Sequence, residues 1–258
     1  AAFVLFFLVA CIGIQWLRVS INNEKMMPPS HPLRISTQIA NNNFGGTKVI
    51  SLVFEGDILN PGILQTMDRF ETRLKKIPRV GSVTSLATVV RTISRAMNDP
   101  GDPLYDVIPD NRDIIAQYIE FYNMSGNPGD FEKLTNFDYT KANLSIQFRA
   151  ENITEFKKVE AAIDQLIHST SWCTLKAGHC LVEKEMAESI VRGQNYSLAF
   201  ALLSIILLLW WIFRSLKAGL IGSIPLFFTL ICNFGLMGWA GIELDIATSL
   251  LSSVAIGL

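Results

Sequence analysis

The chain has 258 residues, of which 50% are hydrophobic, and its 22 Lys and Arg residues nearly balance 23 Asp and Glu residues. The net charge of −1 excludes the broad basic surface on which nucleic-acid binding depends, so we expect no nucleic-acid partner. Because the mean hydropathy is positive, we expect part of the chain to face lipid and the rest to form an ordinary globular domain.

The C-terminal quarter of the chain is nearly free of charge. Residues 193–258 contain four charged side chains, which lie in two short gaps between apolar runs: Arg214 and Lys217, then Glu243 and Asp245. A charge at the bilayer centre costs roughly 2.5–3.5 kcal/mol. The gaps therefore mark where the chain leaves lipid, and the pattern predicts a membrane protein with one large water-facing domain between its first two spans.

Four apolar stretches are candidate membrane spans. Residues 1–17 predict a first, truncated span; a signal peptide explains them less well, because they lack a basic start and a small-residue cleavage site. Residues 197–213 and 218–240 predict the second and third spans, and residues 246–258 begin a fourth that is too short to cross alone. Because both ends of the chain lie in apolar runs, we expect it to be an N-terminal fragment of a longer protein.

The loops between these stretches predict the orientation of the chain. The short basic turn with Arg214 and Lys217 should face the cytoplasm. The turn at 241–245 and the domain at 18–195 then face the periplasm or cell exterior, which predicts a multi-pass protein of the cell (inner) membrane. Asp245, which lies just before the fourth span, suits a helix N-cap.

Small and polar residues in the third and fourth spans predict close helix packing and candidate transport-path positions. Pro225 is a hinge candidate, and Asn233 fits either a helix–helix hydrogen bond or a place on a transport path. In the fourth span Ser249, Ser253 and Gly257 recur every four residues and predict a polar stripe that faces the bundle interior. The glycines whose spacing lets helices approach closely are Gly219, Gly222, Gly235, Gly238 and Gly241.

The water-facing segment divides into two similar halves, residues 35–98 and 142–195. Apolar periodicity predicts the order strand, helix, strand, helix in each half, and the last helix, from Val182, should continue into the second span. Two such units on one sheet predict a ferredoxin-like α/β sandwich. Residues 99–141 predict a surface insertion. The expected fold is an α+β membrane protein: a transmembrane helical bundle plus an extracytoplasmic ferredoxin-like β-α-β domain of porter type.

Two features of this domain leave alternatives open. Phe131, Phe137 and Tyr139 in the insertion fit either a hydrophobic ligand path or the insertion's own small core. Gly45 and Gly46, which follow a short predicted helix, fit either a helix C-cap or a hinge between membrane and domain.

Few residues indicate covalent or metal chemistry. Cys173 and Cys180 are a possible disulfide in an oxidising compartment. His179 lies beside Cys180, but no third and fourth ligands are in sight, so we predict no metal site. The sequence has no phosphate-binding glycine loop and no Ser-His-Asp arrangement. We therefore expect a protein that is not an enzyme and that needs no cofactor.

The whole chain resembles the RND superfamily of exporters, specifically the MmpL-like, hydrophobe-exporter branch. Residues 213–220 (FRSLKAGL) and 224–226 (IPL) are similar to the family's cytoplasmic turn into the third span. Residues 241–248 (GIELDIAT) and 255–258 (AIGL) are similar to the start of the fourth span, and residues 42–46 (NNFGG) also match. In Patched-like relatives this group of spans is called a sterol-sensing domain.

The resemblance implies a function and its partners. In the family the fourth span continues as Gly-x-x-x-Asp, and the aspartate relays protons; if Gly257 is that glycine, the aspartate lies beyond the last residue of this chain. The implied activity is export of lipids or other hydrophobic compounds, driven by the proton-motive force. The implied partners are membrane lipids, a lipid or hydrophobic small-molecule substrate, and either further copies of the chain or a periplasmic protein.

Three other interpretations remain open. One is a Patched-like sterol-sensing receptor or accessory protein, and another is the permease subunit of a macrolide-type ABC exporter, whose ATPase is a separate chain. A protein-translocation motor of the SecD/SecF type is the third. An ionisable residue in the continued fourth span and a second six-span repeat would favour the RND exporter.

Overall fold

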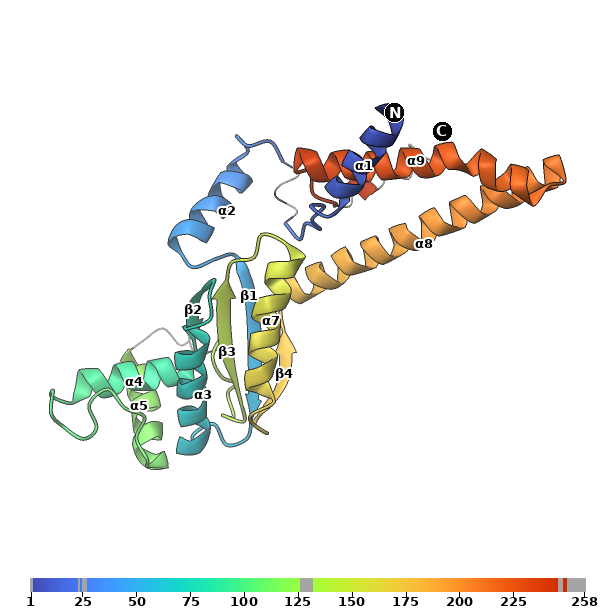
Figure 1. Cartoon of the computed structure of the whole chain (residues 1–258). Coiled ribbons are helices and arrows are strands. Elements are labelled where there is room, and N and C mark those ends of the chain that lie inside the picture. The colour runs from blue at the N-terminus through green and yellow to red at the C-terminus, as the bar shows by residue number, and fades with distance from the viewer. Residues whose placement is uncertain (1, 23, 25–26, 126–131, 246–247, 250–258) are drawn as a thin grey trace. The chain divides into compact units, whose positions relative to one another are not determined.

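The computed structural model describes all residues except 1, 23, 25–26, 126–131, 246–247 and 250–258 (Figure 1). The chain packs as two compact units. The helical unit comprises Ala1–Asn23, Glu151–Ile153 and Glu183–Leu258, and the sheet unit comprises Glu24–Ala150 and Thr154–Val182. Residues 151–153 join the helical unit because Asn152 forms a β-bridge with Ser20 and the Ile153 N–H donates to the Val19 carbonyl. The units therefore end at different residues from the expected domain of 18–195.

The sheet unit is built on one four-stranded antiparallel sheet with the order β2-β3-β1-β4. The strands are β1 Lys48–Glu55, β2 Val80–Thr84, β3 Lys141–Phe148 and β4 Cys173–Ala177. Helix α3 (Pro61–Leu74) connects β1 to β2, and helix α7 (Ile153–Ile167) connects β3 to β4. Each half thus places one strand of the other half between its own two strands, which is a split β-α-β arrangement. The strand and helix order predicted from the sequence is confirmed.

Register and side-chain alternation give the sheet one apolar face. Ile50 lies opposite Ile146 and Leu52 lies opposite Leu144, and all four are fully buried. Helix α3 covers this face through the contact of Phe70 with Phe54, whose ring centroids lie 5.6 Å apart. Helix α7 covers it through Phe156 and Phe148, at 5.4 Å, and Figure 1 shows both helices on one side of the sheet.

Between β2 and β3 the described residues form helices α4 (Leu86–Met97) and α5 (Arg112–Ser125). A capping box formed by Ser85 and Thr88 begins α4. Helix α5 belongs to the predicted insertion, and its Ile115 and Ile119 are buried.

Helix α2 (Pro32–Asn43) ends at the glycine pair. Gly45 and Gly46 have φ values of +88° and +130°, a region in which other residues are strained, and the Gly46 N–H donates to the Ala40 carbonyl at 3.4 Å. The helix-cap interpretation of the pair is therefore confirmed. The Gln147 side chain also donates to the Gly46 carbonyl at 2.6 Å, which ties this turn to β3. The hinge interpretation stays a prediction.

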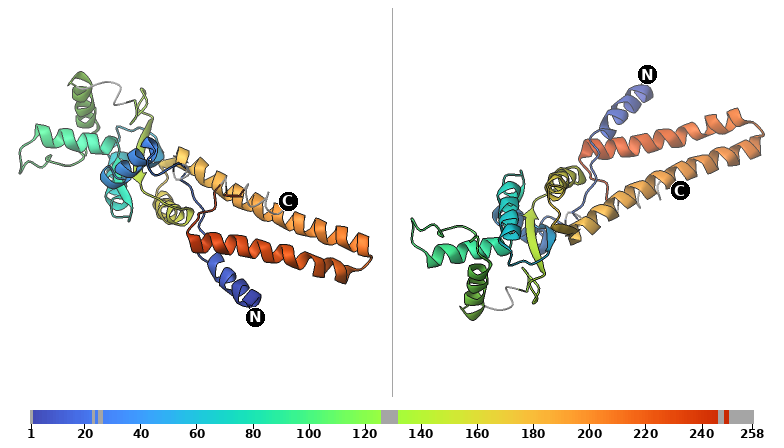
Figure 2. Two further views of the ribbon diagram at one scale, coloured as in Figure 1. Left: turned by 90° about the horizontal axis from the view of Figure 1, so that it is seen from above. Right: turned by 90° about the horizontal axis from the view of Figure 1, so that it is seen from below.

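The apolar helices that the structure describes in the helical unit are α1 (Ala2–Ile14), α8 (His179–Phe213) and α9 (Leu216–Ala240). Helices α8, of 35 residues, and α9, of 25 residues, are long and apolar enough to cross a membrane, and they form a hairpin (Figure 2). Helix α8 starts just after β4 and runs unbroken to Phe213, as the sequence predicts. Helix α1 has 13 residues, fewer than the roughly 20 that a crossing needs.

Glycines on α9 allow its neighbours to approach its backbone. A β-carbon on Gly219 would lie 2.8 Å from the Ile206 carbonyl oxygen of α8, and one on Gly222 would lie 2.7 Å from the Leu209 side chain. Gly235 and Gly238 make still closer approaches to the backbone of α1. The predicted close packing is confirmed at these four positions. Gly241 instead ends α9 in the left-handed conformation, with φ +66°.

Candidate functional site

The chain segments that leave α1 and α9 are joined by backbone hydrogen bonds. Val19 and Leu244 form a parallel β-bridge. The Leu244 N–H donates to the Arg18 carbonyl at 2.7 Å, and the Ser20 N–H donates to the Leu244 carbonyl at 3.0 Å. This bridge fixes Arg18 and Glu243, the first charged residues after two apolar helices, at the same end of the helical unit.

Two tryptophans join α1 to α9 beside this bridge. The rings of Trp16 and Trp239 meet edge to face, with centroids 4.4 Å apart and planes at 88°. The Trp239 Nε1–H donates to the Val9 carbonyl at 2.9 Å. Tryptophan is enriched where helices leave the hydrocarbon core, because its ring is apolar and its N–H is polar. The pair therefore suits the membrane interface predicted at the end of the first span.

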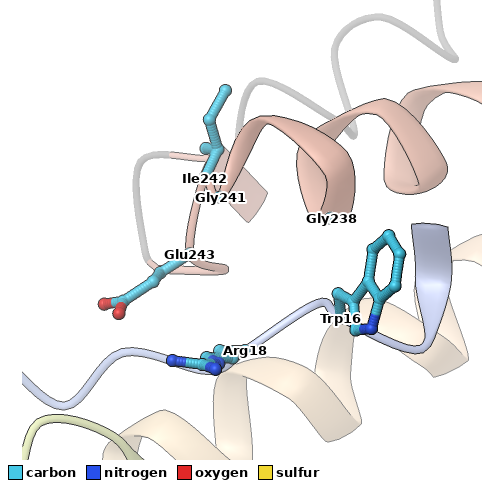
Figure 3. Close-up of a pocket in the computed structure, with 6 residues that line it drawn as sticks. All are labelled: Trp16, Arg18, Gly238, Gly241, Ile242 and Glu243. Atoms are coloured by element: carbon cyan, nitrogen blue, oxygen red, sulfur yellow. The ribbon is translucent and has the colours of Figure 1, made fainter.

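These residues enclose a pocket of about 300 Å³ between the ends of α1 and α9. Figure 3 shows the Trp16 indole beside Gly238, and the charged ends of Arg18 and Glu243 extending in one direction on the other side of the pocket. Gly241 and Ile242 complete the lining. One cation, one anion and one indole suit a zwitterionic group with an apolar tail. The sequence patterns did not predict this pocket. The positions of Arg18 and Glu243 could have indicated it, because each of these charges directly follows an apolar run.

The transport-path candidates lie partly outside the described residues. Asn233 is half-buried on α9. Ser249 is 4% exposed, in agreement with an inward-facing position, whereas Ser253 and Gly257 lie outside the described residues. The Asp245 carboxylate accepts from the Thr248 N–H at 2.7 Å, and Thr248 Oγ1 accepts from the Asp245 N–H at 2.8 Å. The predicted N-cap is thus confirmed, while the polar stripe stays a prediction.

Pro225, the hinge candidate of the third span, lies inside an uninterrupted α9. Proline has no N–H, so the helix lacks one backbone hydrogen bond at this point. Thr229 Oγ1 donates to the Pro225 carbonyl at 2.9 Å one turn further on. The missing hydrogen bond makes the helix easier to bend at Pro225, which a hinge requires. Hinge motion itself stays a prediction.

The possible disulfide between Cys173 and Cys180 is not formed, and both residues are buried free thiols. Cys173 pairs with Phe54 on β1, whereas the Cys180 thiol donates to the Val49 carbonyl at 2.9 Å. Five residues of strand separate Phe54 from Val49, or about 16 Å, and a disulfide needs α-carbons within about 7 Å. The extended β4 keeps the two thiols apart, which the sequence spacing did not reveal.

A second cavity, of about 350 Å³, lies between α4 and α5. We call it the α4–α5 groove; it is lined by Thr88, Val89, Thr92, Ile93, Ala96, Met97, Phe121 and Tyr122. This lining carries no charged group, so the groove suits an apolar ligand. The aromatic residues that fitted either a ligand path or the insertion's own core do not line this groove where the structure describes them: Phe137 is 96% exposed, and the Tyr139 hydroxyl accepts from the Asn123 side chain at 3.3 Å. Phe137 is therefore not part of an insertion core. Phe131 lies outside the described residues.

Among the residues that the structure describes, no group of three His, Cys, Asp or Glu side chains is placed to hold a metal ion.

Comparison with known proteins supports a membrane location. No protein-family model matches the chain. The chain is similar to a protein of Methanocaldococcus jannaschii named "Putative membrane protein MJ1562", with 23% identity over 251 residues. The aligned part covers 91% of this chain and 61% of the relative, so the chain spans less than two thirds of that protein's length. The relative's name and the two candidate spans together indicate membrane localisation.

Proposed function

We propose that the chain belongs to an RND-type, MmpL-like transporter that uses the proton-motive force to export lipids or other hydrophobic compounds. The observation that carries the proposal is the path of the chain after β4. The last strand of a split β-α-β sheet leads directly into α8, which continues as a candidate membrane span. Mechanical coupling requires a rigid element that connects the membrane helices to the domain that holds the substrate. A helix shared by a water-facing domain and a span is such an element.

The α4–α5 groove supports the substrate class. Its lining is uncharged, and Met97 and Phe121 on its walls are 50% and 54% exposed. Covering apolar surface stabilises a complex by roughly 25 cal/mol per Å². An apolar group therefore gains binding free energy in this groove, whereas an ion would lose hydration without gaining a partner.

The energetics of proton coupling are sufficient for such a cycle. One proton that crosses the membrane releases about 2.3 kcal/mol per 100 mV. Protonation of an intramembrane carboxylate removes its desolvation cost, after which the neighbouring helices can repack. The close glycine contacts of α9 with α1 and α8 make this repacking sensitive to small helix displacements.

The proposed topology places the sheet unit on the periplasmic side of a multi-pass inner-membrane protein. A membrane-impermeant maleimide tests this in intact cells with a cysteine-free background. Phe137→Cys, at a position 96% exposed, should be labelled from outside. Lys217→Cys, in the first turn of α9, should be labelled only after the membrane is opened. The reverse pattern would contradict the orientation.

Transport itself is tested in proteoliposomes that carry the protein and a fluorescent lipophilic substrate. An imposed proton gradient should drive substrate movement, and a protonophore should abolish it. Ala96→Trp fills the α4–α5 groove and should reduce transport about tenfold or more, whereas Ala161→Trp adds the same bulk on the exposed face of α7 and should not. Transport that needs ATP instead of the gradient would indicate an ABC permease. Sterol binding without transport would indicate a Patched-like sensor.

A further inference from the structure

A third cavity, of about 310 Å³, lies between α3 and the connection from α7 to β4. We call it the arginine groove. Arg69 and Arg73 of α3 lie on one side, and Thr170 and Trp172 of the connection lie on the other. Its lining contains no Asp or Glu. Two cations in a cavity without a carboxylate make its electrostatic potential positive.

Both guanidinium groups keep donors available. Arg69 Nη2 donates to Thr66 Oγ1 at 2.9 Å, which holds the side chain along α3 and uses one of its five N–H groups. Arg73, on the same helix face one turn later, forms no ion pair with any residue in the described ranges. Residues four apart on a helix place their β-carbons about 6 Å apart. Two guanidinium forks can therefore reach one small anion.

Two of the three hydroxyl groups of the lining already donate to backbone carbonyls, and the third, Thr170 Oγ1, accepts from the Trp172 N–H at 3.4 Å. Thr66 Oγ1 donates to the Gly62 carbonyl at 2.8 Å, and Ser169 Oγ donates to the Leu166 carbonyl at 2.6 Å. The free hydrogen-bonding capacity of the groove is thus dominated by arginine N–H groups. A ligand that matches it must be rich in acceptors and negatively charged.

The groove also has an aromatic wall. Trp172 is 36% exposed, and a β-carbon on Gly62 would lie 3.4 Å from its ring, so the indole packs close to the start of α3. The Glu55 N–H donates to the Trp172 carbonyl at 2.9 Å and fixes the backbone at this point. Phe70, 3% exposed, forms the floor. The wall is therefore preformed and suits the organic part of an amphiphilic anion.

We propose that the arginine groove binds the phosphate group of an organic phosphate ester. Arg69 and Arg73 each direct paired N–H groups at the phosphate oxygens, and the Trp172 ring packs against the organic part. Phosphate fits better than carboxylate, because its additional oxygens can engage two guanidinium groups at once. The ester is either a lipid headgroup or a soluble metabolite. This site is separate from the α4–α5 groove and does not depend on the proposed transport activity.

Titration calorimetry on the complete chain in an uncharged detergent tests the site. The probes are inorganic phosphate, glycerol 3-phosphate and dihexanoyl phosphatidic acid. We expect saturable binding of both esters at one site, weakened about tenfold by Arg73→Gln, because a charge-assisted hydrogen bond is lost. Lys76→Gln removes an equal charge at an exposed position of the same helix end outside the groove, and it should change affinity less than about twofold.

The other results of these titrations either identify the type of ester or overturn the proposal. Tighter binding of phosphatidic acid than of glycerol 3-phosphate identifies a lipid headgroup, and equal binding identifies a soluble ester. Trp172→Ala should weaken binding of the esters and leave inorganic phosphate unchanged. Absence of saturable binding to the esters, or equal losses in Arg73→Gln and Lys76→Gln, would overturn the proposal. Arg73 is exposed, so the variant should keep the unfolding temperature of the wild type, which circular dichroism checks.

Discussion

Gly13 and Gly235 lie backbone to backbone where α1 and α9 pack. A β-carbon on Gly13 would collide with the Gly235 carbonyl, and one on Gly235 would lie 2.7 Å from the Ala10 carbonyl carbon. We expect Gly235→Ala to force the helices apart and to lower the free energy of unfolding by about 1–3 kcal/mol, the usual cost of overpacking. Denaturant unfolding in detergent measures this loss.

Gly193→Ala is the matched control, because the same methyl group is added in open space. No atom lies within 4 Å of a β-carbon at Gly193, which lies inside α8. Alanine should raise the stability of this helix by about 0.5–1 kcal/mol. Equal effects of the two substitutions would contradict the close packing of α1 on α9.

Glu71 connects α3 to the start of α4 and is 3% exposed. Its Oε1 accepts from the Ser85 hydroxyl at 2.5 Å and the Thr88 hydroxyl at 2.6 Å. Glu71→Ala leaves the buried Ser85 hydroxyl without this acceptor, so we expect a loss of about 2–4 kcal/mol in unfolding free energy. Glu132→Ala, at an exposed position, should change stability by less than about 0.5 kcal/mol. An undiminished unfolding temperature in Glu71→Ala would refute the buried link.

The Cys173 thiol should react slowly in the folded protein. Burial raises the pKa of this thiol to about 11, so at pH 8 almost none of it is the reactive thiolate. Alkylation followed by peptide mass spectrometry should show a rate that climbs with pH up to about pH 11. In guanidinium chloride the ordinary pKa near 8.5 should return and the rate at pH 8 should rise. Rapid folded-state alkylation at neutral pH would contradict the burial.

The raised pKa of the Cys173 thiol should lower the stability of the folded protein at alkaline pH. The folded state keeps the Cys173 proton to a higher pH than the unfolded chain does. Stability from this group is therefore fully present below about pH 8.5 and is lost as pH rises toward 11. Cys173→Ala should remove this component, which alkaline denaturation curves of the two proteins would reveal. Parallel curves for both proteins between pH 8.5 and pH 11 would show that the thiol is not linked to folding.

The Arg112–Asp57 ion pair connects the start of α5 to the turn after β1, with Arg112 Nε 2.8 Å from Asp57 Oδ2. The hydrogen bond from Arg112 lowers the pKa of Asp57, so its stabilising effect is present above the ordinary value near 4 and is lost as pH falls through the lowered value. The stability difference between wild type and Asp57→Asn should thus be small but measurable at pH 7 and should shrink as pH falls below about 4. A difference that does not change with pH in the acid range would mean that Asp57 acts through packing, not charge.

Local sequence patterns were sufficient to predict the elements of the sheet unit. The alternation of Leu144, Ile146 and Phe148 with polar residues predicted β3, and all three side chains are buried on one face. The Asp245 N-cap was predicted in the same way, because capping depends on residues within one helical turn. Element boundaries differed by a few residues, as for α8, which begins at His179 instead of Val182.

Local sequence patterns did not predict which segments far apart in the chain are in contact. The sequence placed Cys173 and Cys180 seven positions apart, and only the extended conformation and register of β4 show that they cannot meet. Arg73 and Trp172 come from different halves of the domain, and they share a groove because the chain after α7 returns beside α3. Tyr122 belongs to α5, but its place in the α4–α5 groove depends on the packing of two helices.

The sequence by itself determined where the chain is apolar enough to leave water and where charge obliges it to return, because the transfer free energy of a segment depends on its own residues. It also determined the order of strands and helices, since their periodicities are local. Only the tertiary structure decided which of these segments become neighbours. Residues far apart in the chain come together in the sheet order, in the pocket with Arg18 and Glu243, and in the arginine groove. Such contacts depend on the free energy of the whole fold, which no single segment determines.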